Sequence, residues 1–154
     1  MKLLCLLLFL TLGLSSGAQV NGIRFTNDTL LSTILEKAKK ANKLVFIDCY
    51  DTFCGACKLM DKQVFPDKEV GSFFNKNFIN AKFDMLKSEG IKIQKTYNIR
   101  WVPTFLFLNS KGEIVASAIG FLDSKNFIRI GQSALTPKLF SNDKLISLLV
   151  LNTL

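Results

Sequence analysis

Two cysteines three residues apart, Cys54 and Cys57, are the residues of this sequence best suited to chemistry. They directly follow an apolar run, residues 43–50, that is typical of a buried β-strand. Residues i and i+3 are neighbours on one helical turn, so the two sulfurs could form or break a disulfide with little movement of the backbone. We therefore predict a redox-active pair where a strand is followed by a helix.

The two cysteines are expected to have different roles. Cys54 falls at the first turn of the predicted helix, where unpaired backbone N–H groups favour an anion, so it is the expected nucleophile. The helix dipole supplies only about 0.3–1 kcal/mol, less than the ~1.4 kcal/mol that lowers a pKa by one unit. We therefore expect a hydrogen bond from the Cys57 thiol to contribute. Cys57 would then resolve the mixed disulfide and leave a Cys54–Cys57 disulfide.

The alternatives for this pair are half of a zinc site or a passive disulfide. Zinc prefers four ligands, the chain has no histidine, and Cys49 is the one soft ligand left once Cys5 is removed with the N-terminal segment. No metal is therefore expected. A disulfide across three residues closes almost no chain and would stabilise the fold very little. A role in thiol–disulfide exchange therefore explains the pair better than a structural disulfide does.

Asp48 is the second informative residue, because a carboxyl group interrupts an otherwise apolar strand. Burial should raise its pKa, which makes it a candidate proton acceptor for Cys57. The alternative is a carboxylate that is simply hydrogen bonded at the strand end. Lys82, on the neighbouring predicted strand, is a candidate partner, although a lysine by itself is more often a surface residue. Cys49, on the opposite face of the strand, is expected to be a small buried apolar residue, with a regulatory thiol as the alternative.

The N-terminus has the pattern of a secretory signal. Lys2 precedes an apolar stretch at residues 3–14, and Ser16-Gly17-Ala18 supplies small residues for cleavage after Ala18. An uncleaved anchor is the alternative, but the stretch is shorter than the ~20 residues that span a bilayer. We expect residues 1–18 to be a cleaved signal peptide, with no stable membrane span afterwards, and residues 19–135 to form one domain. Residues 136–154 would be an extension, in which Ser141–Leu151 could be a helix packed on its own domain, a dimer contact or a frayed tail.

Composition narrows the possible functions. The chain of 154 residues carries 20 basic and 12 acidic residues, and its lysines are scattered rather than clustered. Scattered charge indicates a solvated surface and argues against a nucleic-acid partner. The absence of histidine excludes histidine-based general catalysis.

Strand and helix patterns alternate along the chain, which predicts an α/β sheet covered by helices, with a late hairpin adding an antiparallel section. We expect an edge strand at 21–25 and a helix that begins at Asn27 or Asp28 and ends near Asn42. The further predicted elements are strand 43–50, helix 54–64, helix 67–75, strand 78–84, helix 88–97, strand 104–108, strand 113–119 and a helix that Asp123 caps and that ends near Leu135.

From about Leu30 to Leu135 the sequence resembles thioredoxin-fold proteins. The resemblance rests on five ordered segments: Val45-Phe46-Ile47-Asp48 with Cys54-Gly55-Ala56-Cys57-Lys58, Ala81-Lys82-Phe83-Asp84, Val102-Pro103-Thr104, Lys111-Gly112-Glu113, and Gly120. It implies a central mixed sheet flanked by helices and chemistry without a bound cofactor. Asp48 and Lys82 match the family's buried acid and its lysine partner.

The resemblance also implies a substrate-binding surface. Val102–Pro103 would be a cis peptide that lies against the cysteines, and the Val102 backbone would pair with an extended substrate segment. Phe53, Gly55 and Ala56 would complete this surface. The stretch at residues 60–70 is most similar to secreted bacterial thioredoxin-like proteins, which are themselves similar to the C-terminal domain of inner-membrane thiol:disulfide interchange reductases.

Departures from the family pattern bear on the direction of the reaction. Phe53 and Ala56 stand where classical thioredoxins have Trp and Pro, and the residue between the cysteines tunes the redox potential. Without a histidine there, we favour a reductant. The expected function is therefore a periplasmic or secreted thiol–disulfide oxidoreductase, with disulfide-containing exported proteins as substrates and a membrane or soluble electron donor. The alternatives are an oxidase that installs disulfides and a binding or chaperone module with idle thiols.

Overall fold

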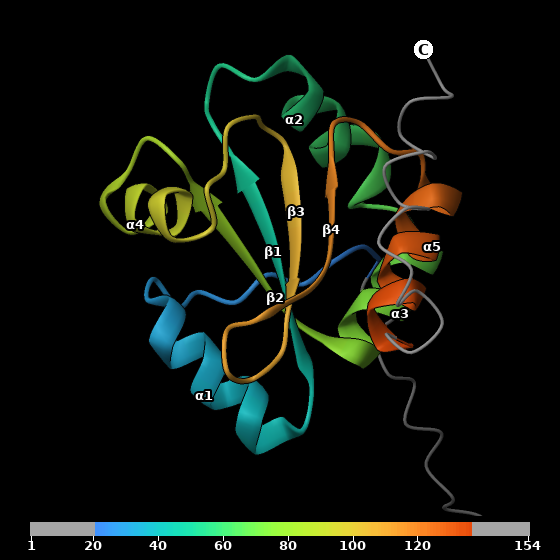
Figure 1. The fold of residues 1–154 in the computed structure, drawn as a ribbon. Helices are drawn as coiled ribbons and strands as arrows, with labels where there is room; N and C mark the ends of the chain where they lie inside the picture. Colours follow the sequence, from blue (N-terminus) through green and yellow to red (C-terminus); the bar gives the residue numbers. More distant parts are fainter. Residues whose placement is uncertain (1–20, 137–154) are drawn as a thin grey trace, which may run out of the picture.

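The computed structural model describes residues 21–136, so the predicted signal segment and the predicted helix Ser141–Leu151 lie outside the described residues. Its centre is a four-stranded sheet in the order β2-β1-β3-β4 (Figure 1). The strands are β1 (Leu44–Tyr50), β2 (Phe78–Asp84), β3 (Thr104–Leu108) and β4 (Ile114–Ile119). β1 and β2 run parallel, whereas the β1–β3 and β3–β4 pairs are antiparallel. The predicted mixed sheet is confirmed.

Helices cover both faces of this sheet. In Figure 1, α1 (Leu31–Ala41) and α4 (Ser88–Thr96) lie on one side of the strands, and α3 (Lys68–Asn77) and α5 (Ser124–Leu135) lie on the other. The short α2 (Gly55–Leu59) and the π-helical turn η1 (Met60–Val64) follow the end of β1. Among residues 21–136, no helix combines the length and apolar character needed to span a bilayer.

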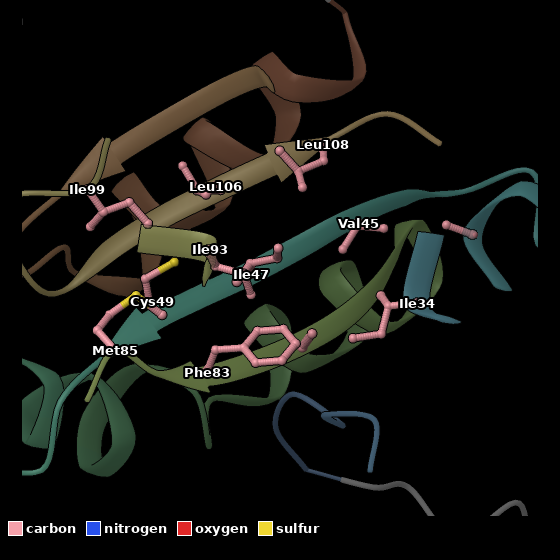
Figure 2. Close-up of a cluster of buried hydrophobic side chains, with 12 residues drawn as sticks. Ile34, Val45, Ile47, Cys49, Phe83, Met85, Ile93, Ile99, Leu106 and Leu108 are labelled. Atoms are coloured by element: carbon pink, nitrogen blue, oxygen red, sulfur yellow. The ribbon is translucent and has the colours of Figure 1, made fainter. Parts of the chain in front are cut away.

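Each sheet face has its own hydrophobic cluster. Between the sheet and α1 and α4 the cluster is mainly aliphatic (Figure 2) and consists of Ile34, Ala38, Val45, Ile47, Cys49, Ala81, Phe83, Met85, Ile93, Ile99, Leu106 and Leu108. The opposite cluster is mainly aromatic, with Phe46, Phe65, Phe74, Phe78, Phe105, Phe107 and Phe127 packed together with Met60, Val64, Val70 and Ala134. The residues of β1 alternate between the two clusters, as expected for a strand that is buried on both faces.

The predicted edge strand at residues 21–25 is wrong. In the structure this segment makes a single parallel bridge, between Phe25 and Asn80. Side-chain amides replace the rest of a strand ladder, because Asn75 Oδ1 accepts from the Arg24 backbone N–H and Asn80 Nδ2 donates to the Arg24 carbonyl. The segment is therefore held beside β2 without becoming a strand.

The start of the first helix also differs from the prediction. Neither Asn27 nor Asp28 caps it: α1 begins at Leu31 without a side-chain cap. Asp28 instead pairs with Lys37 Nζ at 2.6 Å, and Glu89 Oε1, on α4, accepts the N–H of Leu31 at 3.2 Å. The first-turn donor is thus satisfied from a distant element, which a local capping rule does not anticipate.

The helix after the cysteines is not one continuous α-helix as predicted. α2 ends at Leu59 and continues as the π-helical turn η1, which Phe65 closes by donating its N–H to the Met60 carbonyl at 2.9 Å. The wider turn buries Met60 and Val64 in the aromatic cluster and leaves Asp61 exposed.

Candidate active site

Cys54 and Cys57 are joined by a disulfide, with their Cα atoms 5.3 Å apart. Cys54 is the N-cap of α2, and its Sγ accepts a hydrogen bond from the Cys57 backbone N–H at 3.0 Å. Cys57 is buried, whereas Cys54 is partly exposed. Because α2 has only five residues, this local N–H is a more direct source of thiolate stabilisation than a helix dipole, and it would act beside the hydrogen bond that the sequence predicts from the Cys57 thiol in the reduced protein.

Asp51 shapes the backbone that leads into the cysteines. Its Oδ1 accepts hydrogen bonds from the N–H groups of Phe53 at 2.8 Å and Cys54 at 2.7 Å. This is the local side-chain-to-backbone turn typical of aspartate. Asp51 was not among the predicted site residues, although an Asp three residues before the first cysteine is a readable signal for such a turn.

We expect Asp51→Ala to lower the free energy of unfolding by about 1 kcal/mol, because two backbone donors lose their acceptor at the start of α2. Urea unfolding of the oxidised protein measures this change. Asp51→Asn keeps an acceptor oxygen and is the matched control, expected to retain most of the stability. An equal loss in both variants would show that charge, rather than the hydrogen bonds, is what matters.

A second loop lies at the same end of the sheet. The β1–β3 register pairs Cys49 with Thr104, so Pro103 follows at the level of Tyr50, where β1 ends and the loop to the cysteines begins. The Val102–Pro103 peptide is cis, as the resemblance implied. Thr104 Oγ1 donates to the Trp101 carbonyl at 2.6 Å, and the Gly120 N–H donates to the Pro103 carbonyl at 2.9 Å. Within the described residues, no group is hydrogen bonded to the backbone of Val102.

Apolar side chains are exposed around the disulfide. Phe53, immediately before Cys54, is 85% exposed, and Trp101, two residues before Pro103, is 71% exposed. Gly55 is exposed, and a side chain at its position would meet no atom within 4 Å. Ala56 is half-buried beside it. Trp101 was not singled out as a site residue by the sequence, although a tryptophan beside the Val-Pro-Thr segment was visible.

Asp48 lies in the sheet beneath η1 and is 1% exposed. The parallel register places it opposite Lys82, whose Nζ lies 2.9 Å from Asp48 Oδ2. Lys82 Nζ also bonds to Asp61 on η1 and lies 4.5 Å from the centroid of the Tyr50 ring. The predicted pairing of Asp48 with Lys82 is therefore present, and Asp61 is a third member that sequence reasoning missed.

The electrostatics of this group follow from its burial. Loss of hydration raises the pKa of Asp48 to about 6, although the charge of Lys82 partly opposes the rise. Burial alone would lower the pKa of Lys82, but the carboxylates of Asp48 and Asp61 outweigh it and hold that pKa above its usual value. The arrangement thus offers a buried carboxyl group that changes protonation near neutral pH.

Cys49 is separate from this site. It lies on the other face of β1, as predicted, among Ile47, Met85 and Ile93 in the aliphatic cluster (Figure 2). Burial raises the pKa of its thiol well above the ordinary value, so the thiolate is disfavoured. Within residues 21–136, no three or more His, Cys, Asp and Glu side chains gather into a candidate metal site.

These observations place a cysteine disulfide, a cis-proline loop and a buried acid at one end of a mixed sheet. The family model for the thioredoxin-like domain matches residues 31–135, most of the chain. The chain belongs to the thioredoxin-like family. The Cys54–Cys57 disulfide lies within the matched region of this thioredoxin-like domain.

This thioredoxin-like chain is similar to two kinds of known protein. It is 33% identical over 120 residues to the thiol:disulfide interchange protein DsbD of Vibrio cholerae, covering 73% of this chain and 20% of that protein. The chain thus spans about a fifth of the length of the curated relatives that it matches. A proposed disulphide isomerase from Bacteroides thetaiotaomicron, solved in solution, is 38% identical with a TM-score of 0.67, covering 77% of this chain and 97% of that one.

The C-terminal domain of Neisseria meningitidis DsbD, in its oxidised form, shares the fold. It is 20% identical with a TM-score of 0.59, over 73% of this chain and 98% of that domain. The resemblance to the C-terminal domain of a thiol:disulfide interchange protein is therefore confirmed at the level of the fold.

Proposed function

We propose that this protein is an exported reductant that opens disulfides in other exported proteins by dithiol–disulfide exchange. The observation that carries the proposal is the asymmetric pair of cysteines, one partly exposed and one buried, in a thioredoxin-like domain. One sulfur can reach a protein substrate, while the other is shielded until a mixed disulfide has formed.

In the proposed reaction, the reduced protein attacks with the Cys54 thiolate, which the Cys57 backbone N–H stabilises. The attack forms a mixed disulfide and releases one substrate sulfur as a thiolate, which takes a proton from water. Cys57 then gives its proton to the Asp48 carboxylate and attacks Cys54 Sγ. The Cys54–Cys57 disulfide forms, the second substrate sulfur leaves and is protonated, and the protein has lost two electrons to the substrate.

The surroundings of the disulfide support a polypeptide substrate. The backbone of Val102, which no described residue bonds, can pair with an extended segment in the manner of an added strand. Phe53 and Trp101 present exposed aromatic rings for the flanking side chains of that segment. Gly55 and Ala56 are small residues and add little bulk beside Cys54.

Export is part of the proposal because of the leader-like residues 1–18 and the similarity to DsbD, a thiol:disulfide interchange protein by name. A reductant outside the cytosol needs a supply of electrons, for which a membrane or soluble dithiol protein is the proposed donor. Cell fractionation, with mass determination of the N-terminus, tests this part: a mature chain beginning at Gln19 is expected.

The direction of the reaction is tested by the reduction potential. We expect a value more negative than about −180 mV, the potential of protein disulfide isomerase, because no histidine or other cation lies between the cysteines to favour the reduced form strongly. Equilibration with glutathione at pH 7, read by thiol alkylation and mass spectrometry, gives the potential. A clearly less negative value would favour the alternative, an oxidase that installs disulfides.

A further inference from the structure

Lys82 contacts two carboxylates, but it is hydrogen bonded to only one of them. Its aligned hydrogen bond goes to Asp61, whereas its 2.9 Å contact with Asp48 is an ion pair without hydrogen-bond geometry. Neither oxygen of Asp48 receives a hydrogen bond from the described residues, although both are buried. A buried carboxyl group left in this way is costly when it is ionised.

The position of Asp61 explains this preference. Asp61 lies on the π-helical turn η1, between Met60 and the buried Val64, and is 46% exposed. The Lys82 side chain, 21% exposed, passes Tyr50, Phe65 and Phe25, whose ring centroids lie 4.5, 5.1 and 5.7 Å from Nζ. These aromatic rings favour a cation at the position of the Lys82 ammonium, and Asp61 holds the ammonium on the side nearer the solvent.

We propose that Asp61 is a positioning residue that holds the Lys82 ammonium toward the surface and so keeps Asp48 able to exchange a proton with the active-site thiols. The inference rests on the proposed function, in which Asp48 takes the proton of Cys57. When Cys57 attacks, its proton passes to Asp48. The neutral Asp48 afterwards releases it to water at the Asp61 side, while Lys82 keeps its charge throughout.

Several charged or titratable groups lie on the elements around Asp48. They are Cys57 and Lys58 on α2, Asp61 and Lys62 on η1, Lys82 and Asp84 on β2, and Tyr50 on β1 itself. The other two strands, β3 and β4, carry no charged residue. Of these groups, Lys82 alone is within ion-pair distance of Asp48 among the described residues. The charge of Asp61 also opposes ionisation of Asp48 directly, so its pKa is raised further.

The test is the pKa of Asp48 in the oxidised full chain, followed by ¹³C NMR of its carboxyl group. Asp61→Asn should let Lys82 turn to Asp48, and we expect the pKa of Asp48 to fall by about one unit. Asp61→Glu should restore the wild-type value, because its carboxylate can still reach Lys82. Glu36→Gln removes the same charge from the exposed face of α1 and is the matched control, expected to change nothing.

A double-mutant cycle separates positioning from simple charge. In a Lys82→Met background, Asp61→Asn should shift the pKa of Asp48 by less than half as much as it does with Lys82 present. An unchanged or raised pKa in Asp61→Asn would overturn the proposal, and so would a shift that persists undiminished without Lys82. These readouts need no turnover, so an inactive wild type would defeat the proposed function and leave the positioning role standing.

The same variants give a kinetic readout. In stopped-flow measurements of mixed-disulfide resolution, the acid limb of the pH profile should move to lower pH in Asp61→Asn by the same amount as the pKa of Asp48. A profile that loses rate at every pH without moving would indicate a merely structural role and would contradict the proposal.

Discussion

Cys54→Ser is expected to reduce insulin disulfides at the uncatalysed background rate, a loss of at least about 100-fold. A serine hydroxyl is not ionised near neutral pH and cannot form a disulfide, so no first attack takes place. The fold should persist, because a disulfide between residues three apart contributes little to stability. Turbidity of precipitating insulin chains, with dithiothreitol as electron source, measures the rate.

Cys57→Ser is the matched partner of this variant, because it removes the other sulfur from the same turn. It keeps the nucleophile but cannot resolve the intermediate, so it should accumulate a mixed disulfide with the substrate that non-reducing electrophoresis detects. Cys49→Ser should behave as the wild type, since Cys49 is buried on the opposite sheet face. Equal rates for the wild type and Cys54→Ser would contradict the mechanism and favour a binding module with idle thiols.

Rapid alkylation tests the same sulfur in the reduced protein. Cys54 is partly exposed and its Sγ accepts the Cys57 N–H, so iodoacetamide at pH 7 should label it faster than a peptide thiol. Cys57 is buried and should be labelled slowly. Labelling of Cys54 at the rate of an ordinary thiol would remove the physical basis of the proposed first step.

Much of this arrangement could be read from the sequence, because local patterns determine it. The strands 78–84 and 104–108 were predicted with their observed bounds, since side-chain alternation marks the first and an apolar run before the turn at residues 109–112 marks the second. The cap of α5 at Asp123 was also predicted correctly, and its side chain accepts the Asn126 N–H at 2.8 Å. Such features depend on a few neighbouring residues, which a linear reading can see.

The errors concern interactions between distant residues. The first helix begins late because Asp28 is engaged by Lys37 and Glu89 supplies the missing acceptor from another helix. Asp61 was not predicted for a similar reason. Its contact with Lys82 depends on a π-helical turn, which shifts the helical register of the following residues by one position, and the sequence carries no plain signal for such a turn. Tertiary packing determines which groups contact a buried charge, so these partners can be identified from the structure but not from the sequence.

Asp48→Asn is expected to stabilise the oxidised protein by as much as about 3 kcal/mol at pH 7. Burial raises the pKa of Asp48 from 3.8 to about 6, and each pH unit corresponds to about 1.4 kcal/mol. Below pH 3.8 the carboxyl is neutral in both folded and unfolded chains. Between pH 3.8 and about 6 the unfolded chain has lost the proton and the folded chain still holds it, so stability falls as the pH rises.

The neutral amide of Asn escapes this penalty, and Lys82 keeps Asp61 as its partner in the variant. The gain in stability should therefore be present at pH 7 and nearly absent at pH 3.5. Urea unfolding of both oxidised proteins at the two pH values measures it. A gain of equal size at both would show that packing, rather than ionisation, is responsible, and no gain at pH 7 would contradict the raised pKa.

The same substitution should slow catalysis, because an amide cannot accept the proton of Cys57. General-base assistance is worth about 100-fold or more, so resolution of the mixed disulfide at pH 7 should slow by a factor of that order. The first attack by Cys54 should change much less, and single-turnover mixing with a labelled disulfide peptide separates the two steps. Asp84→Asn is the control: Asp84 is also buried in a strand, at the end of β2, but it is paired with Lys87 rather than Lys82. A protein that becomes more stable and yet resolves more slowly would show that Asp48 is retained for chemistry at the expense of stability.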